Sequence, residues 1–192
     1  MSTSLYTFIF LSIMLLIFSQ GTAKKQREEK HLRSTPPKNE NHRFHQLCRH
    51  EHNKYRKLHH VNILRTNSTL YIKARGWASY LSKLDITTDV PHEYTPGIGE
   101  NIYWMTNAQK PYTQYAEKAV QYWYAENKYY NYDTGRFSPN TAHFTQMVWK
   151  STTQVGCGYN VSRTLTLFVV CKCFPQGNIA GQYQSNVLRP SQ

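Results

Sequence analysis

A single histidine opens the segment "TAHFTQMVWKST" (141–152), which is otherwise rich in apolar side chains. Three of the apolar residues recur at i, i+3 and i+4, the spacing of one helical face. They are Phe144, Met147 and Val148. The spacing predicts a short helix with Asn140 or Thr141 as its cap. His143 then lies in the first turn, at the edge of whatever the helix covers, and its role there is the first question that the sequence raises.

The remaining histidines do not complete a known catalytic motif. "HEHNK" (50–54) fails the metalloprotease pattern HExxH, because Lys54 stands where the second histidine ligand would be. The chain also lacks the GxSxG, Walker and GxGxxG patterns. We expect His52 and Asn53 to tie the first helix to its neighbours. Four histidines are interpreted as solvated or structural: His50, His52, His59 and His60.

The four cysteines predict disulfides rather than a metal cluster, since the chain carries an export signal and no CxxC pair. "QVGCGYNVSRTLTLFVVCKCF" (154–174) is typical of a β-hairpin. A three-residue turn at 163–165 places Cys157 directly opposite Cys171, within the distance that a disulfide accepts. Cys173 shares a face with Cys171, and Cys48 remains as its expected partner.

The N-terminus is typical of a secretory signal peptide. The apolar run from Leu5 to Phe18 is too short to span a bilayer core comfortably, and small residues Gly21 and Ala23 precede a suitable cleavage point. We predict a signal peptide over 1–23 and a secreted, extracellular product. A membrane signal anchor is the competing interpretation, because no Lys or Arg precedes the apolar run.

The formal net charge of +12 is unevenly distributed. Residues 24–43 hold seven basic and three acidic side chains, no aromatic residue and a proline pair, which predicts a flexible basic arm. This arm is either a solvated spacer or a segment attracted to anionic glycans or phospholipid. Nucleic acid is the least expected partner, because no aromatic stacking pattern accompanies the charge.

Two sequons become meaningful in an exported chain. Asn67 and Asn160 each begin an N-x-S/T tripeptide and are expected glycosylation sites. Asn160 would lie near the end of the hairpin, where we expect it to be exposed.

Hydrophobic periodicity predicts the elements that must position these residues. Helical patterns with apolar residues on one face occupy three segments, and Ser68 is the expected cap of the second. A glycine-opened strand is expected between the second and third helices. The helical segments are 44–60, 68–84 and 112–127, and the strand is 97–105. The expected fold is one α+β domain over 44–192, a three-layer α-β-α sandwich with a small antiparallel sheet.

Four ordered motifs resemble those of the cysteine-rich secretory, antigen-five and pathogenesis-related (CAP) superfamily. They are "HNKYR" (52–56), "GENIY" (99–103), "HFTQMVWKSTTQVGCG" (143–158) and "FVVCKCFPQGNIAGQY" (168–183). The resemblance covers the chain from Phe44 onward, and its ending is most similar to the Golgi-associated plant pathogenesis-related branch. That branch typically carries a myristoylated glycine after the initiator methionine, whereas Ser2 follows here. The family pairing of the cysteines carries over to Cys157–Cys171, and Cys173 replaces the tyrosine usual in secreted relatives.

The resemblance implies a cleft lined by two histidines and two glutamates that can hold a divalent metal, commonly zinc. The corresponding residues are His92 in "VPHEY", Glu100 in "GEN", Glu126 in "WYAE" and His143 in "HFTQMVW". Two imidazole nitrogens leave coordination positions open for water or a ligand, with the carboxylates as ligands or as orienting groups.

Two classes of function compete on this basis. The favoured one is a non-enzymatic extracellular binding protein that holds a lipid, a sterol or a partner, and that can form a homodimer. An apolar ligand would contact the aromatic-rich segment 101–112. The alternative is a metal-dependent peptidase in which Glu100 or Glu126 acts as base on a zinc-bound water. Members of the resembled family that regulate ion channels carry an added cysteine-rich tail. No further cysteine follows "CKC" in this sequence, so ion-channel regulation is disfavoured.

Overall fold

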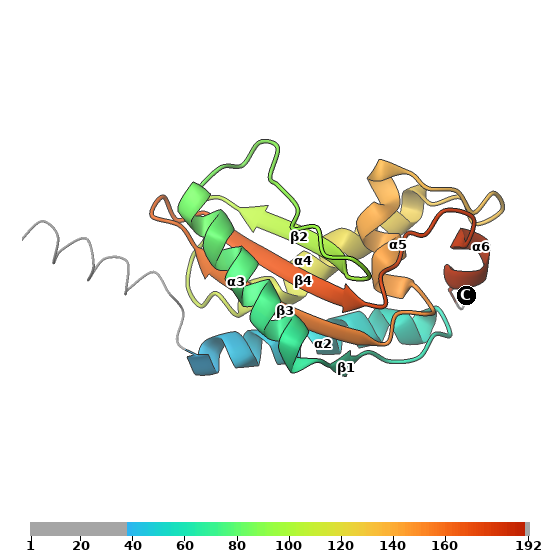
Figure 1. The fold of residues 1–192 in the computed structure, drawn as a ribbon, viewed down its shortest axis with the longest axis horizontal. Coiled ribbons are helices and arrows are strands. Elements are labelled where there is room, and N and C mark those ends of the chain that lie inside the picture. Colours follow the sequence, from blue (N-terminus) through green and yellow to red (C-terminus); the bar gives the residue numbers. More distant parts are fainter. Residues whose placement is uncertain (1–37, 191–192) are drawn as a thin grey trace, which may run out of the picture. The chain divides into compact units, whose positions relative to one another are not determined.

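A four-stranded mixed sheet lies at the centre of the domain (Figure 1). The computed structural model describes residues 38–190, so the expected signal peptide and residues 24–37 lie outside the described part. The strands are β1 (Arg65–Thr66), β2 (Gly99–Met105), β3 (Gln154–Val161) and β4 (Leu167–Phe174), in the order β1-β3-β4-β2. The sheet is antiparallel except for the short β1, which runs parallel to β3. The expected antiparallel sheet is therefore confirmed for its three long strands only.

Helices cover both faces of this sheet, which confirms the three-layer arrangement. The helices are α2 (Lys38–Leu58), α3 (Ser68–Leu84), α4 (Gln114–Tyr124), α5 (Ala142–Val148) and α6 (Tyr183–Asn186), with 3-10 turns η1 (Ala125–Tyr129) and η2 (Pro139–Thr141). Residues of α2, α4 and α5 form the larger core with one face of β3 and β4. Residues of α3 form a smaller core on the other face. No helix in the described range 38–190 is both long and apolar enough to cross a membrane.

The first helix begins earlier than its apolar pattern predicts. It starts at Lys38, so the last six residues of the expected basic arm belong to the folded domain. Asn41 is buried there, and its side chain hydrogen-bonds both the N–H and the carbonyl of Tyr159 at 3.1 and 3.2 Å. His45 accepts a hydrogen bond from the N–H of Cys157 at 3.1 Å. These side chains satisfy backbone groups of β3 that β1 is too short to pair, and they protect that edge of the sheet.

The β3–β4 hairpin has the predicted register. The N–H of Ser162 donates to the carbonyl of Thr166 at 2.8 Å across a loop of residues 163–165. Cys157 lies opposite Cys171 with a Cα–Cα distance of 4.1 Å, and the two form a disulfide.

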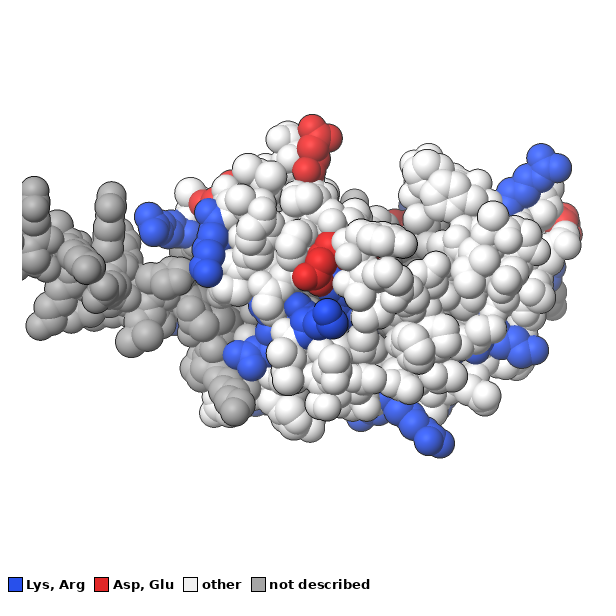
Figure 2. Space-filling model, viewed as in Figure 1, with Lys and Arg blue, Asp and Glu red and all other residues white. Residues whose placement is uncertain are grey.

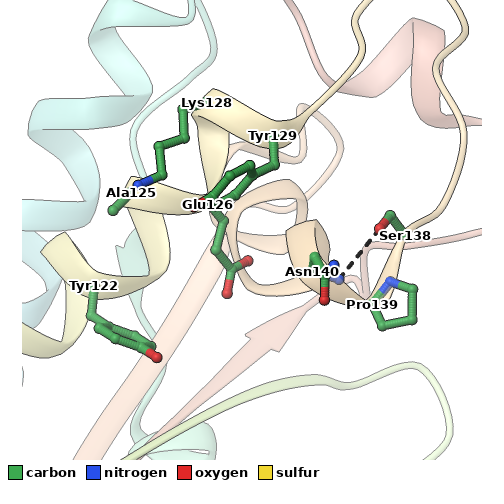
Figure 3. A pocket seen from close by; sticks show the side chains of 8 residues that line it. All are labelled: Tyr122, Ala125, Glu126, Lys128, Tyr129, Ser138, Pro139 and Asn140. Carbon is green, nitrogen blue, oxygen red and sulfur yellow. Dashed lines mark hydrogen bonds between the residues drawn. The ribbon is translucent and has the colours of Figure 1, made fainter.

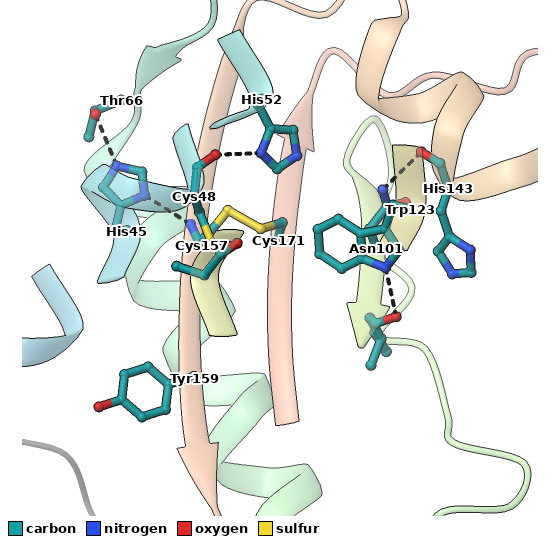
Figure 4. Close-up of a disulfide and its surroundings, with 12 residues drawn as sticks. His45, Cys48, His52, Thr66, Asn101, Trp123, His143, Cys157, Tyr159 and Cys171 are labelled. Atoms are coloured by element: carbon teal, nitrogen blue, oxygen red, sulfur yellow. Dashed lines mark hydrogen bonds between the residues drawn. A yellow bond between two sulfur atoms is a disulfide. The ribbon is translucent and has the colours of Figure 1, made fainter. Parts of the chain in front are cut away.

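The expected Cys48–Cys173 disulfide is wrong, because both thiols are free and buried. Cys48 on α2 lies over the other two cysteines, with its sulfur within 4.8 Å of both disulfide sulfurs (Figure 4). Cys173 is two residues further along β4 and interacts with Arg56, which is two helical turns away from Cys48 on α2. Burial raises the pKa of Cys173 to about 12, so this thiol stays protonated at neutral pH.

The two sequons differ in their surroundings. Asn67, rather than the expected Ser68, is the N-cap of α3, and its side-chain oxygen accepts hydrogen bonds from Thr69 and Leu70. Asn160 was expected to be exposed, but it is only 3% exposed, because it lies within the eight-residue strand β3 rather than in the turn. Of the two asparagines, only Asn67 is accessible in the folded domain.

Candidate functional site

Glu126 and His143 form one half of the candidate site. The imidazole Nδ1–H of His143 donates to Glu126 Oε1 at 2.7 Å. The other carboxylate oxygen, Oε2, accepts the backbone N–H groups of His143 and Phe144, each at 3.1 Å. These N–H groups are the free donors at the start of α5. Glu126 therefore caps the helix, whereas Thr141 occupies the cap position without a side-chain hydrogen bond and Asn140 lies in η2.

The rest of His143 is fixed by its neighbours on α4 and β2. The fully buried ring of Trp123 lies nearly parallel to the imidazole, with ring centroids 6.2 Å apart and planes 14° apart. Asn101 donates from its side chain to the carbonyl of His143 at 3.0 Å, as drawn in Figure 4. The imidazole remains partly exposed, so its free nitrogen can reach a ligand.

The far end of α5 is held by Arg56, the last residue of the "HNKYR" motif. Its guanidinium is fully buried and donates to four backbone carbonyls at 2.8–3.0 Å. The carbonyls belong to Asn62, Met147, Trp149 and Thr152. Burial lowers the pKa of Arg56 to about 10, which leaves it charged at neutral pH. In the same motif Asn53 exchanges two hydrogen bonds with Leu64, as expected. His52 bonds to the carbonyl of Cys48 in its own helix, and its ring contacts that of Trp123 on α4, with centroids 6.0 Å apart.

Glu100 and His92 form the second half of the site with the same chemistry. The Nδ1–H of His92 donates to Glu100 Oε1 at 2.7 Å, and the N–H of Glu93 donates to the same oxygen at 3.1 Å. The Glu100 side chain is 5% exposed, whereas that of His92 is 58% exposed. The strand β2 thus presents a buried carboxylate that orients an exposed imidazole on the preceding loop.

Lys172 is a functional candidate that the sequence analysis missed. It lies opposite Glu100 in the β2–β4 register and is fully buried. Its ammonium forms ion pairs with Glu100 Oε2 at 2.5 Å and Glu93 Oε2 at 2.7 Å. The pairing of Glu100 with Lys172 follows from the residue register between β2 and β4, which the sequence analysis did not predict. No local pattern in "CKC" indicates it.

Adjacent residues of β2 connect the two halves. Glu100 holds His92, and Asn101, the next residue, holds the backbone of His143. Successive side chains of a strand point to opposite faces of the sheet, so the four residues implied by the family resemblance are linked through the backbone of β2, not by hydrogen bonds between the two halves. They form two histidine–glutamate pairs.

The site contains side chains of the types that bind metal ions, but they are too few and too far apart to complete the coordination of a cation by themselves. In both pairs a carboxylate binds Nδ1–H, so the lone pair of Nε2 remains for a ligand, the pattern typical of metal-binding histidines. Among residues 38–190, no three His, Cys, Asp or Glu donor atoms from the site lie within 4.8 Å of one another. One group in this range meets that distance, Cys48 with Cys157 and Cys171, but two of its sulfurs form the disulfide. A cation at the histidines would need water or a ligand to complete its coordination.

A pocket of about 630 Å³ opens beside Glu126 (Figure 3). Its walls come from α4, η1 and the η2 region: Tyr122, Ala125, Glu126, Lys128, Tyr129, Ser138, Pro139 and Asn140. The side chains of Tyr122 and Tyr129 are largely exposed, and the Lys128 ammonium lies over the ring of Tyr129. Of the four site residues, the pocket touches Glu126 alone.

Comparison with known proteins identifies the family of this chain. Residues 49–173 match the family model "CAP: Cysteine-rich secretory protein family". The human Golgi-associated plant pathogenesis-related protein 1 is 34% identical over 149 residues, covering 77% of this chain and 94% of that protein. The solved structure of BmVAL-1 has a TM-score of 0.60 at 21% identity, covering 78% of this chain and 84% of that one. A structure titled "NaASP2 with Zn2+" has a TM-score of 0.59 at 17% identity, covering 82% and 89%. The chain belongs to the cysteine-rich secretory (CAP) protein family.

Proposed function

We propose that this chain is a secreted, non-enzymatic binding protein. Its two outward imidazoles hold a divalent cation such as zinc, and it binds a lipid or sterol beside them. One observation carries the proposal: the carboxylate oxygens of both glutamates already accept hydrogen bonds from N–H groups of the protein. Glu126 accepts three N–H donors. Glu100 accepts two and pairs with Lys172.

This hydrogen bonding disfavours the alternative of a metal-dependent peptidase. A general base must direct a free lone pair at the water that it deprotonates. Glu100 and Glu126 instead direct their oxygens at donors of the protein, which suits the orientation of His92 and His143. The sequence also completes no catalytic motif.

The metal part of the proposal rests on the donor chemistry of the imidazoles. Each is held by its Nδ1–H and offers Nε2, the atom that zinc takes. A bound cation would supply positive charge and open positions for a ligand oxygen. The related fold solved "with Zn2+" supports this choice of ion.

The ligand part of the proposal rests on the pocket next to Glu126. Its volume of about 630 Å³ lies within the range of small-molecule sites. The exposed rings of Tyr122 and Tyr129 offer apolar faces for a lipid or sterol.

Secretion is supported by the apolar N-terminal run and by the Cys157–Cys171 disulfide, which persists in an oxidising compartment. The basic residues before the domain favour an anionic glycan or phospholipid surface as a further partner. Homodimer formation is part of the same proposal.

Zinc titration by calorimetry tests the metal site. His143→Ala should abolish most binding, because it removes one of two nitrogen donors, whereas the matched change at exposed His50 should leave affinity unaltered. Glu100→Gln should weaken binding by about ten- to a hundredfold, as loss of an orienting partner does. Zinc affinity that persists in His143→Ala would place the site elsewhere.

Native mass spectrometry of the secreted protein tests the remaining parts together. It should reveal bound zinc, a co-purified or added sterol or fatty acid, and the number of subunits. An activity screen with zinc-loaded protein completes the test. Peptide cleavage by wild type that disappears in Glu126→Gln would establish the peptidase instead.

A further inference from the structure

A pocket of about 530 Å³ lies where β1 forms one edge of the sheet. Its walls come from the loop before β1, from β1 itself and from the start of β3: Asn62, Ile63, Arg65, Thr153 and Gln154. Ile63 is a large apolar side chain, yet 53% of it is exposed. This pocket shares no lining residue with the pocket beside Glu126, so the histidine–glutamate site does not account for it.

Backbone hydrogen bonds hold the walls of this pocket in place. The N–H of Arg65 donates to the carbonyl of Thr153 at 2.9 Å, and the N–H of Thr153 donates to the carbonyl of Phe174 at 3.0 Å. The carbonyl of Asn62 accepts a hydrogen bond from Nε of Arg56 at 2.8 Å. The pocket is therefore preformed, because the sheet fixes one side and the buried Arg56 fixes the other.

The accessible sequon residue Asn67 adjoins this pocket through Gln154. Its amide nitrogen Nδ2 donates to Oε1 of Gln154, which lines the pocket. Its Oδ1 accepts hydrogen bonds from the N–H groups of Thr69 and Leu70 at the start of α3. These bonds on both sides fix the plane of the amide. Nδ2 is the atom that carries the sugar in a glycosylated asparagine, and it faces β3 and the pocket rather than α3.

The start of α3 is held close to β3, so the position of Asn67 is fixed as well. Gly156 on β3 lies so near α3 that an added Cβ would be 2.1 Å from the backbone nitrogen of Tyr71. The backbone N–H of Asn67 donates to the carbonyl of Val155 at 3.2 Å. Both this bond and the cap through Oδ1 are compatible with glycosylation, because the sugar replaces one hydrogen on Nδ2 only.

The lining of the pocket suits N-acetylglucosamine, the first sugar of an N-linked glycan. This sugar is uncharged, and its ring face and acetamide methyl group can cover Ile63. Its hydroxyl and acetamide groups can hydrogen-bond the side chains of Asn62, Thr153 and Gln154. Uncharged side chains make up most of the surface over β1 and the start of α3 in Figure 2. The volume also lies within the range of small-molecule sites.

We propose that this pocket binds the first N-acetylglucosamine of a glycan attached to Asn67. The inference rests on the export in the proposed function, because N-linked glycans are a feature of secreted chains. The sugar covers the side chain of Ile63 and lies along β1, the strand at the edge of the sheet. Covering an edge strand prevents it from pairing with a strand of another chain, so the glycan stabilises the domain and protects this edge.

A thermodynamic cycle tests the proposal on the purified, secreted chain. Endoglycosidase treatment of the high-mannose form leaves one N-acetylglucosamine on Asn67, whereas Thr69→Ala destroys the sequon and keeps Asn67 with its cap. Ile63→Ser is introduced into both forms, and urea unfolding is measured. Ile63→Ser should raise the unfolding equilibrium constant of the single-sugar form about fivefold more than that of the unglycosylated form, the effect of uncovering about half of an isoleucine side chain.

Ile72→Ser is the matched control for this cycle. Ile72 is 66% exposed on α3 and does not line the pocket. Its substitution should change the unfolding equilibrium constant equally in the two forms. Nuclear magnetic resonance gives a direct readout, because the single-sugar form should show a nuclear Overhauser contact between the acetamide methyl group and the side chain of Ile63.

Two results would overturn the proposal. An equal effect of Ile63→Ser in both forms, without the Overhauser contact, would mean that the sugar extends into solvent. A secreted chain whose Asn67 carries no glycan by mass spectrometry would leave the pocket without this occupant. A chain retained with an uncleaved N-terminus would contradict the export on which both proposals rest, and this outcome is distinguishable from a sugar that is present but makes no contact with Ile63.

Discussion

Mild acid should destabilise the domain through two buried histidines of α2. His45 accepts from the N–H of Cys157 at Nδ1 and donates from Nε2–H to Thr66 at 2.9 Å. A second proton would sit on Nδ1 and face the N–H of Cys157. Burial, with a contribution from Arg49, lowers the pKa of His45 to about 4. Burial also lowers the pKa of His52 to about 4.

The size of the effect follows from the difference in protonation between the folded and unfolded states. An unfolded histidine has a pKa near 6.5, so between pH 6.5 and 4 the unfolded chain binds more protons. The stabilisation is complete above pH 6.5 and is lost as pH falls through this window, with a slope of about 1.4 kcal/mol per pH unit for each histidine. At pH 5 the free energy of unfolding should be lower by about 2 kcal/mol per histidine, or about 4 kcal/mol for His45 and His52 together. Domains of this size are typically stable by about 5–15 kcal/mol.

Urea unfolding at several pH values between 7 and 5 measures this slope. His45→Gln cannot be protonated and should reduce the slope by about 1.4 kcal/mol per pH unit, the contribution of one histidine, whatever it does to stability at neutral pH. His50→Gln, at an exposed position, should leave the slope unchanged. A free energy of unfolding that is flat from pH 6.5 to 5, or an unaltered slope in His45→Gln, would refute the assignment of neutral buried imidazoles.

Three further predictions concern the folded scaffold. Arg56→Lys should lower the free energy of unfolding by about 3–5 kcal/mol, because one ammonium cannot satisfy four buried carbonyls; chemical denaturation measures this, and a loss below about 1 kcal/mol would contradict it. Cys48 and Cys173 should resist alkylation in the native protein and react once urea unfolds it, as read by mass spectrometry; a mapped Cys48–Cys173 disulfide would show the cysteine assignment to be wrong. Glycosidase treatment of the secreted protein should change its mobility, and Asn67→Gln but not Asn160→Gln should abolish that change.

Local sequence patterns were sufficient to predict much of the fold. Period-3.6 apolar spacing located α2, α3, α4 and α5 but not the four-residue α6, and counting residues across a short turn paired Cys157 with Cys171. The four site residues came from motif resemblance, and they do form two histidine–glutamate pairs. The start of α2 was missed because its first turn carries polar residues such as Asn41, which are buried by contacts with β3 rather than by apolar character.

The sequence by itself determined which elements form and which residues are candidates for the site, since periodicity, turn length and motif order are local properties. Only the tertiary structure decided what each candidate does. Glu126 caps a helix that begins sixteen residues later, and Lys172 neutralises Glu100 from a strand 72 positions away. Cys48 and Cys173 stay unpaired, since the sulfur of Cys48 lies beside the Cys157–Cys171 disulfide whereas Cys173 interacts with Arg56. These outcomes depend on which buried donor lies next to which buried acceptor in the folded chain. In a close-packed interior, contacts between residues far apart in the sequence decide this.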